Sequence, residues 1–425
     1  MFRKFLFIHL CLIGFLLCPV FSKDNLEQGN RQLFGEDWAS KEPLALGENP
    51  ALLDYLRFGV LNNKELRHIY HHWKIGLQNA KVEGSLEDPK LMASQDRGER
   101  VYEFSQMFPF WGKRDARREF ASWEAEEKFL ETLKLRLQLE RDIRKAYYDY
   151  AFLKQETGIT EDTLKLLQQM EPVVQRKIQG GENQNDLLRL QVEIGRVENT
   201  LQTKQRERQA MSAQFNALLG MGYETLLPWP EDFKVETLVW EVETLKQKIR
   251  ERNPDLLTVK VHLVKSKAEQ NLAHLEQWPD WELGWMRTED RVMGESMDGV
   301  KVGMTLPIWG DKNSARLQKA DFSMKGNEVE LTGMETMFFA DLQMILYQMD
   351  DASRQTVLYE KTLLPKAEQA LQITQASYRS GGATLLEVID SERMLLDFEM
   401  TLWEARKNYE ESLADLAFLC GGDVK

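Results

Sequence analysis

The sequence predicts a mainly α-helical protein with a small β part, built from one structural unit that occurs twice. Three observations predict this fold class. The segment Ser105–Ala121 resembles Gly303–Ala320, with the same Pro-x-Trp-Gly step at Pro109 and Pro307, 198 residues apart. Apolar residues recur every three or four positions over long stretches, which indicates coiled-coil helices. Shorter stretches alternate apolar and polar residues, which indicates β-strands.

The chain opens with the features of a secretory signal. Arg3 and Lys4 precede an apolar core that runs to Phe21, and Ser22 follows. We expect residues 1–22 to be removed as a signal peptide. Lipidation at Cys18 is an alternative, although its neighbours fit that modification poorly.

Composition limits the classes of partner. Loss of Arg3 and Lys4, the only charged residues of the signal, takes the formal net charge from -13 to -15. An acidic chain does not favour nucleic acid or anionic lipid. Cys420 would be the only thiol left, so no intrachain disulfide is expected. A content of 43% hydrophobic and 29% charged residues fits long, partly solvated helices.

The duplication predicts the domain organisation. Five segments follow the signal: an irregular segment 23–49, a first repeat 50–226 with a β-hairpin at 90–108, a proline-containing linker 227–235, a second repeat 236–422 with a β-hairpin at 281–306, and a short tail 423–425.

The helices of each half show coiled-coil seams. The clearest are Val388, Leu395, Leu402, Tyr409 and Leu416, each seven residues apart, and Leu331, Met334, Phe338, Leu342, Ile345, Met349 and Ala352. The segment Gly112–Gln179 would span roughly 100 Å as one helix. We expect Gly158 and Pro172 to interrupt this helix, and Pro365 to interrupt the long helix of the second half.

The predicted strands carry apolar residues on one face. Val300, Val302 and Met304 alternate with Lys301 and Gly303, and aromatic residues alternate in the other strands. This pattern is typical of lipid-facing strands. Four strands cannot close a barrel, and an open edge is unfavourable in hydrocarbon, so three copies would pool 12 strands. The alternative is a soluble protein whose hairpins pack on its helices. No stretch after the signal has the 18 consecutive apolar residues of a transmembrane helix.

Three motifs accompany the duplicated unit: LPIWGDKNSAR, YRSGGATLLEVIDSERMLL and the closing NYEESLADLAFLCG. Through them, residues 50 to 422 resemble the TolC-like outer-membrane efflux proteins. The CzcC-like metal-efflux branch is one candidate within this resemblance. The resemblance implies a homotrimer: a 12-stranded β-barrel in the outer membrane of a Gram-negative bacterium, continued by an α-helical barrel through the periplasm. Such a trimer would be the passive exit duct of a tripartite efflux or type I secretion system. Its partners would be a periplasmic adaptor, an inner-membrane pump and outer-membrane lipid, but no nucleic acid.

The resemblance also implies a gate at the periplasmic tip. The turns at Gly180-Gly181 and Gly381-Gly382 lie far from the hairpins, and we expect left-handed glycine conformations there. Glu387 and Asp390, three positions apart on one helix face, match an acidic pair that lines the closed entrance in this family. Six such carboxylates in a trimer would favour cations. A solvated helix face is the alternative.

One position departs from the family pattern. The matching tyrosine and aspartate are present as Tyr378 and Asp186, but Ala383 stands where the family has a gate arginine. Arg189 is a candidate substitute, because it shares a helix face with Asp186. The alternative is a tip that is held more loosely.

The chain carries little that predicts catalysis or metal binding. His68 and His72 are one helical turn apart and could chelate a transition metal, with Glu65 nearby. Exposed histidines on a solvated helix usually have no such role, so we expect neither a metal nor a cofactor.

No HExxH, GxSxG, SxxK, P-loop or GxGxxG motif is present, so we do not expect an enzyme. Two other classes stay open: a soluble periplasmic coiled-coil scaffold or adaptor, and an unrecognised hydrolase.

Overall fold

The computed structural model describes residues 46–47, 50–96, 98–180, 184–231, 233, 235, 240–422 and 424. The chain divides into two compact units, Met1–Ala45 and Leu46–Lys425, and the description below concerns the second. The predicted signal peptide and Cys18 lie outside the described residues, as do most of the segment 23–49 and parts of the predicted linker and tail.

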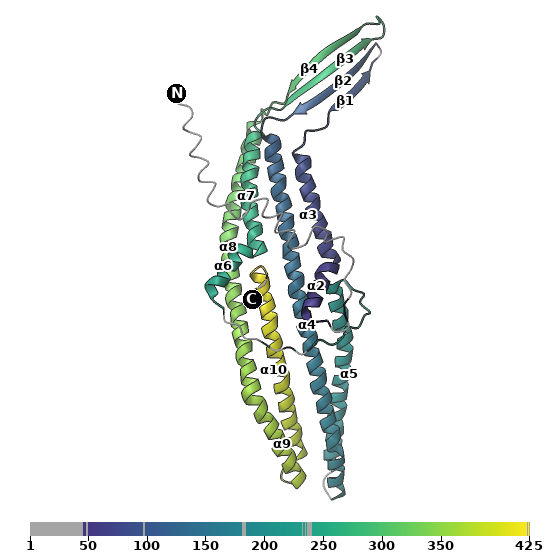
Figure 1. The fold of residues 1–425 in the computed structure, drawn as a ribbon, viewed down its shortest axis with the longest axis vertical. Helices are drawn as coiled ribbons and strands as arrows, with labels where there is room; N and C mark the ends of the chain where they lie inside the picture. The colour runs from purple at the N-terminus through teal and green to yellow at the C-terminus, as the bar shows by residue number, and fades with distance from the viewer. Residues whose placement is uncertain are drawn as a thin grey trace. The chain divides into compact units, whose positions relative to one another are not determined.

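The described chain is mainly helical, with one small antiparallel sheet, as predicted (Figure 1). Its elements in order are α2 (Leu52–Asn62), α3 (Lys64–Glu83), β1 (Lys90–Gln95), β2 (Glu99–Phe108), α4 (Lys113–Gln179), α5 (Asn185–Leu219), α6 (Val242–Arg252), α7 (Pro254–Leu275), β3 (Trp281–Asp290), β4 (Ser296–Met304), α8 (Gly310–Leu358), a π-helical turn (Tyr359–Leu363), α9 (Leu364–Ser380) and α10 (Leu385–Leu419).

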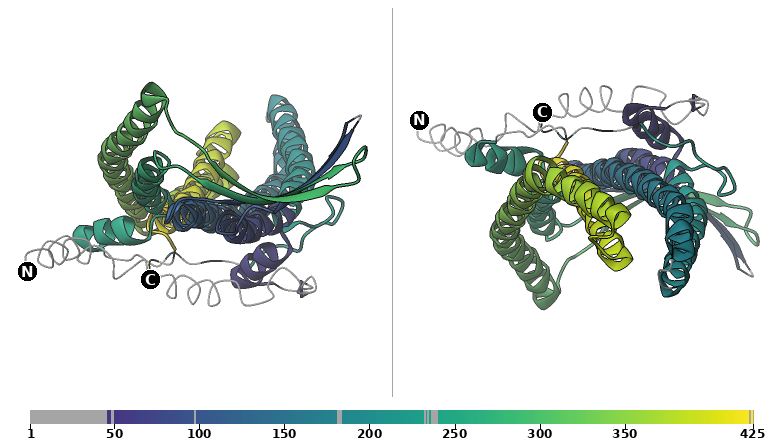
Figure 2. Two further views of the ribbon diagram at one scale, coloured as in Figure 1. Left: turned by 90° about the horizontal axis from the view of Figure 1, so that it is seen from above. Right: turned by 90° about the horizontal axis from the view of Figure 1, so that it is seen from below.

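Two long helices organise the unit. In the half next to the sheet, α4 packs between α3 and α7, and α8 packs on α7. In the other half, α4 packs between α5 and α10, and α10 packs on α8. The helices therefore form one layer that curves, as the views along the long axis show (Figure 2). No described helix has a stretch long and apolar enough to cross a bilayer.

Shorter helices meet end to end beside the two long ones, and an asparagine joins each pair. Asn63 caps α3 by accepting a hydrogen bond from the Leu66 amide, and its Nδ2 donates to the Leu218 carbonyl near the end of α5. Asn253 caps α7 in the same way, and its Nδ2 donates to the Leu419 carbonyl at the end of α10. Each asparagine thus satisfies a helix N-terminus and a helix C-terminus together.

The glycines that follow these C-termini have no room for a side chain. Gly220 and Gly421 adopt φ of 72° and 76°. A Cβ on Gly220 would lie 2.8 Å from the Asn62 carbonyl oxygen, and one on Gly421 would lie 2.2 Å from the Arg252 carbonyl oxygen. The left-handed conformation and the close approach of the stacked helix both require glycine.

The predicted coiled-coil seams form the core of the layer. Phe338, Leu342 and Met349 of α8 are buried against Tyr409 and Leu416 of α10. Nearer the turns, a second cluster joins α4, α5, α9 and α10 through Leu167, Met170, Val174, Leu190, Val197, Leu371, Tyr378, Leu385, Val388 and Ile389. The seven-residue spacing therefore identified the contact faces correctly.

The predicted interruptions of the first long helix are wrong. Helix α4 runs unbroken through Gly158 and Pro172. Met170 and Val174, on either side of Pro172, are buried in the second cluster, and this packing offsets the roughly 3 kcal/mol that an internal proline costs. In the second half the regular α-helix does stop before Pro365, where the π-helical turn joins α8 to α9.

The sheet has the strand order β1-β2-β3-β4, with both hairpins joined through β2 and β3. One cross-strand row consists of Leu91, Phe104, Trp285 and Val300, with exposed fractions of 79%, 46%, 44% and 82%. On the other face Lys301 pairs with Glu103 and Glu282. The apolar face of this sheet has no cover within the described chain.

A buried ion pair anchors the sheet to the helices. The Nζ atom of Lys113, at the start of α4, lies 2.7 Å from Asp280 Oδ1 and donates to the Trp278 carbonyl at 2.6 Å. Asp280 Oδ1 also accepts a hydrogen bond from the Phe110 amide. The Asp280 amide donates one to the Thr305 hydroxyl. The base of one hairpin is thereby fixed to the base of the other.

Candidate functional site at the helical tip

The tip consists of two helical turns, and only one of them shows the expected glycine conformation. Gly381 ends α9 with φ of 86°, and the Gly382 amide donates to the Ser377 carbonyl at 2.8 Å. Gly180 ends α4 with φ of −82°, so a left-handed conformation is wrong for this residue. Gly181 lies outside the described residues.

Glu387 has a structural role at the start of α10. Its carboxylate accepts a hydrogen bond from the Thr384 amide at 2.7 Å, and the Thr384 hydroxyl accepts one from the Glu387 amide. This is a capping box, which supplies partners for two amides of the helix start. The Thr-x-x-Glu sequence is its known signature, so sequence reasoning could have found it.

The acidic pair lies on exposed surface of the single chain. Both Glu387 and Asp390 are exposed, and Asp390 lies close enough to Arg393 to raise the pKa of that guanidinium, after the larger effect of Glu193. The tip therefore carries a cation beside the predicted acidic pair.

Arg393 joins the two helical hairpins of the tip, α4 with α5 and α9 with α10, through an ion pair. Its Nε and Nη2 atoms lie 3.1 Å and 2.6 Å from the two carboxylate oxygens of Glu193 on α5. Glu193 is buried, with 8% of its surface exposed. A two-pronged pair of this kind is stronger than a single charged hydrogen bond. Sequence reasoning missed it because no local pattern pairs residues 200 positions apart.

The other predicted gate residues lie near this contact. Tyr378 is buried between the hairpins, and Lys177 Nζ stands 4.1 Å from the centre of its ring. Ala383 packs against the same cluster. Asp186 is half-buried in the first turn of α5, and in the described part of the chain no ion pair joins it to Arg189. Within the described residues of the single chain, Arg189 thus makes no contact that replaces the missing arginine.

A second carboxylate is buried beside Arg393. Glu392 is 4% exposed and is hydrogen-bonded to the Thr163 side chain of α4. Burial raises the pKa of Glu392, because the charged form loses its hydration. Together, Glu193, Glu392 and Arg393 connect α5, α10 and α4 about two helical turns from the tip.

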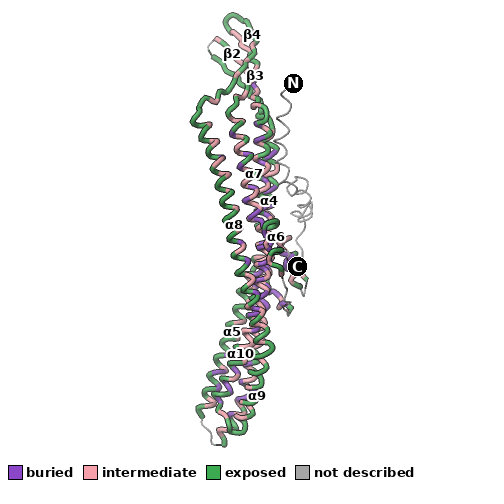
Figure 3. The backbone as a smooth tube through the Cα atoms, turned by 90° about the vertical axis from the view of Figure 1, so that its left-hand side faces the viewer, coloured by how far each residue is buried: buried purple, intermediate pink, exposed green. Residues whose placement is uncertain are grey.

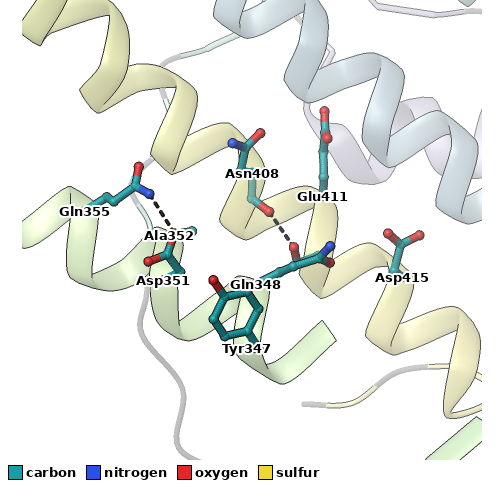
Figure 4. Close-up of a pocket in the computed structure, with 9 residues that line it drawn as sticks. Tyr347, Gln348, Asp351, Ala352, Gln355, Asn408, Glu411 and Asp415 are labelled. Atoms are coloured by element: carbon teal, nitrogen blue, oxygen red, sulfur yellow. Dashed lines mark hydrogen bonds between the residues drawn. The ribbon is translucent and has the colours of Figure 1, made fainter. Parts of the chain in front are cut away.

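A polar groove of about 310 Å³ lies elsewhere, between α8 and α10 (Figure 4). Its carboxylates already have partners: Asp351 pairs with Arg354, and Asp415 Oδ2 lies 2.8 Å from Lys145 Nζ. Burial raises the pKa of Glu411, which also lines the groove, to about 7. Neither histidine nor cysteine is among the residues that line the groove. Its lining is Tyr347, Gln348, Asp351, Ala352, Gln355, Asn408, Glu411, Ser412 and Asp415.

Comparison with known proteins finds a family match in the second half of the chain. Residues 245–422 match the family model described as Outer membrane efflux protein. This part of the chain is therefore similar to that family. A curated relative, the cobalt-zinc-cadmium resistance protein CzcC of Cupriavidus metallidurans, is 27% identical over 172 residues. That match covers 39% of this chain and 38% of the relative, so the chain aligns with well under half the relative's length.

Two solved structures share the fold over nearly the whole described unit. The outer membrane protein VceC of Vibrio cholerae is 18% identical, with a TM-score of 0.72, over 88% of this chain and 97% of that one. The MtrE outer membrane channel of Neisseria gonorrhoeae is 19% identical, with a TM-score of 0.74, over 88% and 90%. The fold of this chain is thus that of an outer membrane protein and of an outer membrane channel.

Proposed function

We propose that this efflux-family chain is one protomer of a trimeric exit duct in the outer membrane of a Gram-negative bacterium. One observation carries the proposal: a two-faced sheet whose apolar face is exposed and whose outer strands, β1 and β4, each pair on one side only. An apolar row such as Leu91, Phe104, Trp285 and Val300 is suited to acyl chains. Three copies would supply 12 strands and leave no open edge.

The helical layer supports the same assembly. Helix α8 forms one edge of the layer, and much of its length is exposed, as Figure 3 shows. Several of its exposed side chains are apolar. Helices α3 and α5 form the opposite edge and also expose apolar side chains. Two different edges that each need cover favour a head-to-tail contact, which closes into a ring by rotation. The exposed residues are Phe322, Val329, Met337 and Met344 on α8, Ile75 and Val82 on α3, and Leu188 and Val192 on α5.

The duct is passive and depends on partners for energy and for opening. A periplasmic adaptor and an inner-membrane pump would engage the end that carries the turns. Glu387 and Asp390 would line the entrance, and the contacts of Tyr378 and Arg393 would hold the two hairpins of each protomer together. The relation to a cobalt-zinc-cadmium resistance protein and the acidic entrance both favour metal cations as the cargo.

Extraction of the full chain from membranes tests the proposal. We expect release only by detergent, as a particle of three chains in mass measurements that correct for bound detergent. A water-soluble single chain would overturn the duct and support a periplasmic scaffold instead. Charge substitution in the apolar row, as in Val300→Lys, should block membrane assembly, whereas Met297→Lys near the loop between the strands should be tolerated.

A further inference from the structure

We propose that His68 and His72 form a surface site for one divalent transition-metal ion. This inference does not rest on the proposed function. The two residues lie one turn apart on α3, and their rings meet edge to face with centroids 4.5 Å apart. The side chains therefore converge on one another rather than pointing apart. A helix holds such a pair in place, so little conformational freedom is lost when an ion bridges the two rings.

The environment leaves both imidazoles accessible. His68 and His72 are exposed, so binding needs no rearrangement of the core. His72 also borders a groove of about 320 Å³ between α3 and α4, which gives water and hydrated ions access from that side. Neighbouring cations have other partners. Lys265, which lines the same groove, has its Nζ 2.9 Å from Glu127, and Lys74 Nζ lies 4.4 Å from the centre of the Trp73 ring.

The ligand set defines the class of ion. Neutral imidazole suits Cu²⁺, Ni²⁺ and Zn²⁺, and Cu²⁺ binds most tightly of the three. Within the described residues no group of three His, Cys, Asp or Glu is placed to hold an ion. Water would therefore complete the coordination, which makes this an open, exchanging site rather than a closed structural one.

Cu²⁺ titration of the full chain in detergent tests the site. We expect one saturable ion per chain and an electron paramagnetic resonance spectrum that shows two coordinated nitrogens. His68→Ala and His72→Ala should each weaken binding about tenfold or more, equal to about 1.4 kcal/mol. His71→Ala is the matched control: it removes an exposed histidine whose ring lies 5.8 Å from Tyr70 instead, and it should bind like the unaltered chain.

Three results would overturn the site. They are an absence of saturable binding, unchanged affinity in His68→Ala and His72→Ala, or an equal loss in His71→Ala, which would indicate a diffuse histidine tract. All three variants change exposed positions of one helix, so the circular dichroism spectrum should be the same for each protein. The outcome is independent of whether the chain forms a duct.

Discussion

Single buried carboxylates in this chain set how its stability responds to pH. Glu126 of α4 has no charged partner, and its Oε1 atom is buried without a hydrogen-bond partner in the described structure. Burial raises the pKa of Glu126 from 4.5 to about 7. The folded chain therefore binds this proton more tightly than the unfolded chain does. The resulting stability is present in full below the unfolded pKa and is lost as pH rises through about 7.

We predict that Glu126→Gln removes this loss. The neutral amide cannot ionise, so the variant should be more stable than the unaltered chain at pH 8, by on the order of 2 kcal/mol, and similar near pH 5. Thermal unfolding in detergent at the two pH values measures the difference. Glu119→Gln, on an exposed position of the same helix, is the control and should change little at either pH. A variant as pH-sensitive as the unaltered chain would contradict this account.

Among the elements, the two junctions between stacked helices depend on one residue type. Asn253 is 1% exposed and makes three hydrogen bonds, two as the cap of α7 and one to α10. We predict that Asn253→Ala destabilises the chain by about 2 to 3 kcal/mol, because it leaves buried partners unsatisfied. Asn63→Ala at the corresponding, more exposed junction should cost less, about 1 kcal/mol.

A second substitution separates the two roles of Asn253. Asn253→Asp keeps the oxygen that caps α7 but removes the Nδ2 donor to the Leu419 carbonyl. Denaturant unfolding should therefore place it between the unaltered chain and Asn253→Ala. Equal stability of Asn253→Asp and the unaltered chain would show that the contact with α10 contributes nothing.

Elements with a repeating pattern could be predicted from the sequence, and contacts between distant elements could not. The heptads of α8 and α10 follow from side-chain periodicity, and the buried Phe338, Leu342 and Tyr409 agree with it. The prediction that Pro172 interrupts α4 was wrong, because it considered only the local effect of a proline. Packing of the residues on both sides of Pro172 keeps the helix intact. The contact between Arg393 and Glu193 and the pairing of β2 with β3 join residues far apart in the chain, so no local signal reports them.

At the scale of the whole molecule, the described part of the chain leaves several surfaces uncovered. The sheet has two free edges, the helical layer has two different apolar edges, and the acidic pair at the tip faces solvent. In a ring of three copies the free edges would be paired, and the acidic pairs would be brought together around one axis. Carboxylates that face solvent on a single chain would then determine which ions pass through the ring.

We predict that Glu387→Gln together with Asp390→Asn lowers the cation preference of the assembled duct. Glutamine retains the capping geometry at Thr384, so α10 should still begin where it does now. Reversal potentials across planar bilayers in a salt gradient measure the preference. Glu328→Gln with Glu330→Gln removes the same charge from an exposed part of α8 away from the turns, and should have a smaller effect. If both double variants keep the original selectivity, Glu387 and Asp390 do not line the path of the ions.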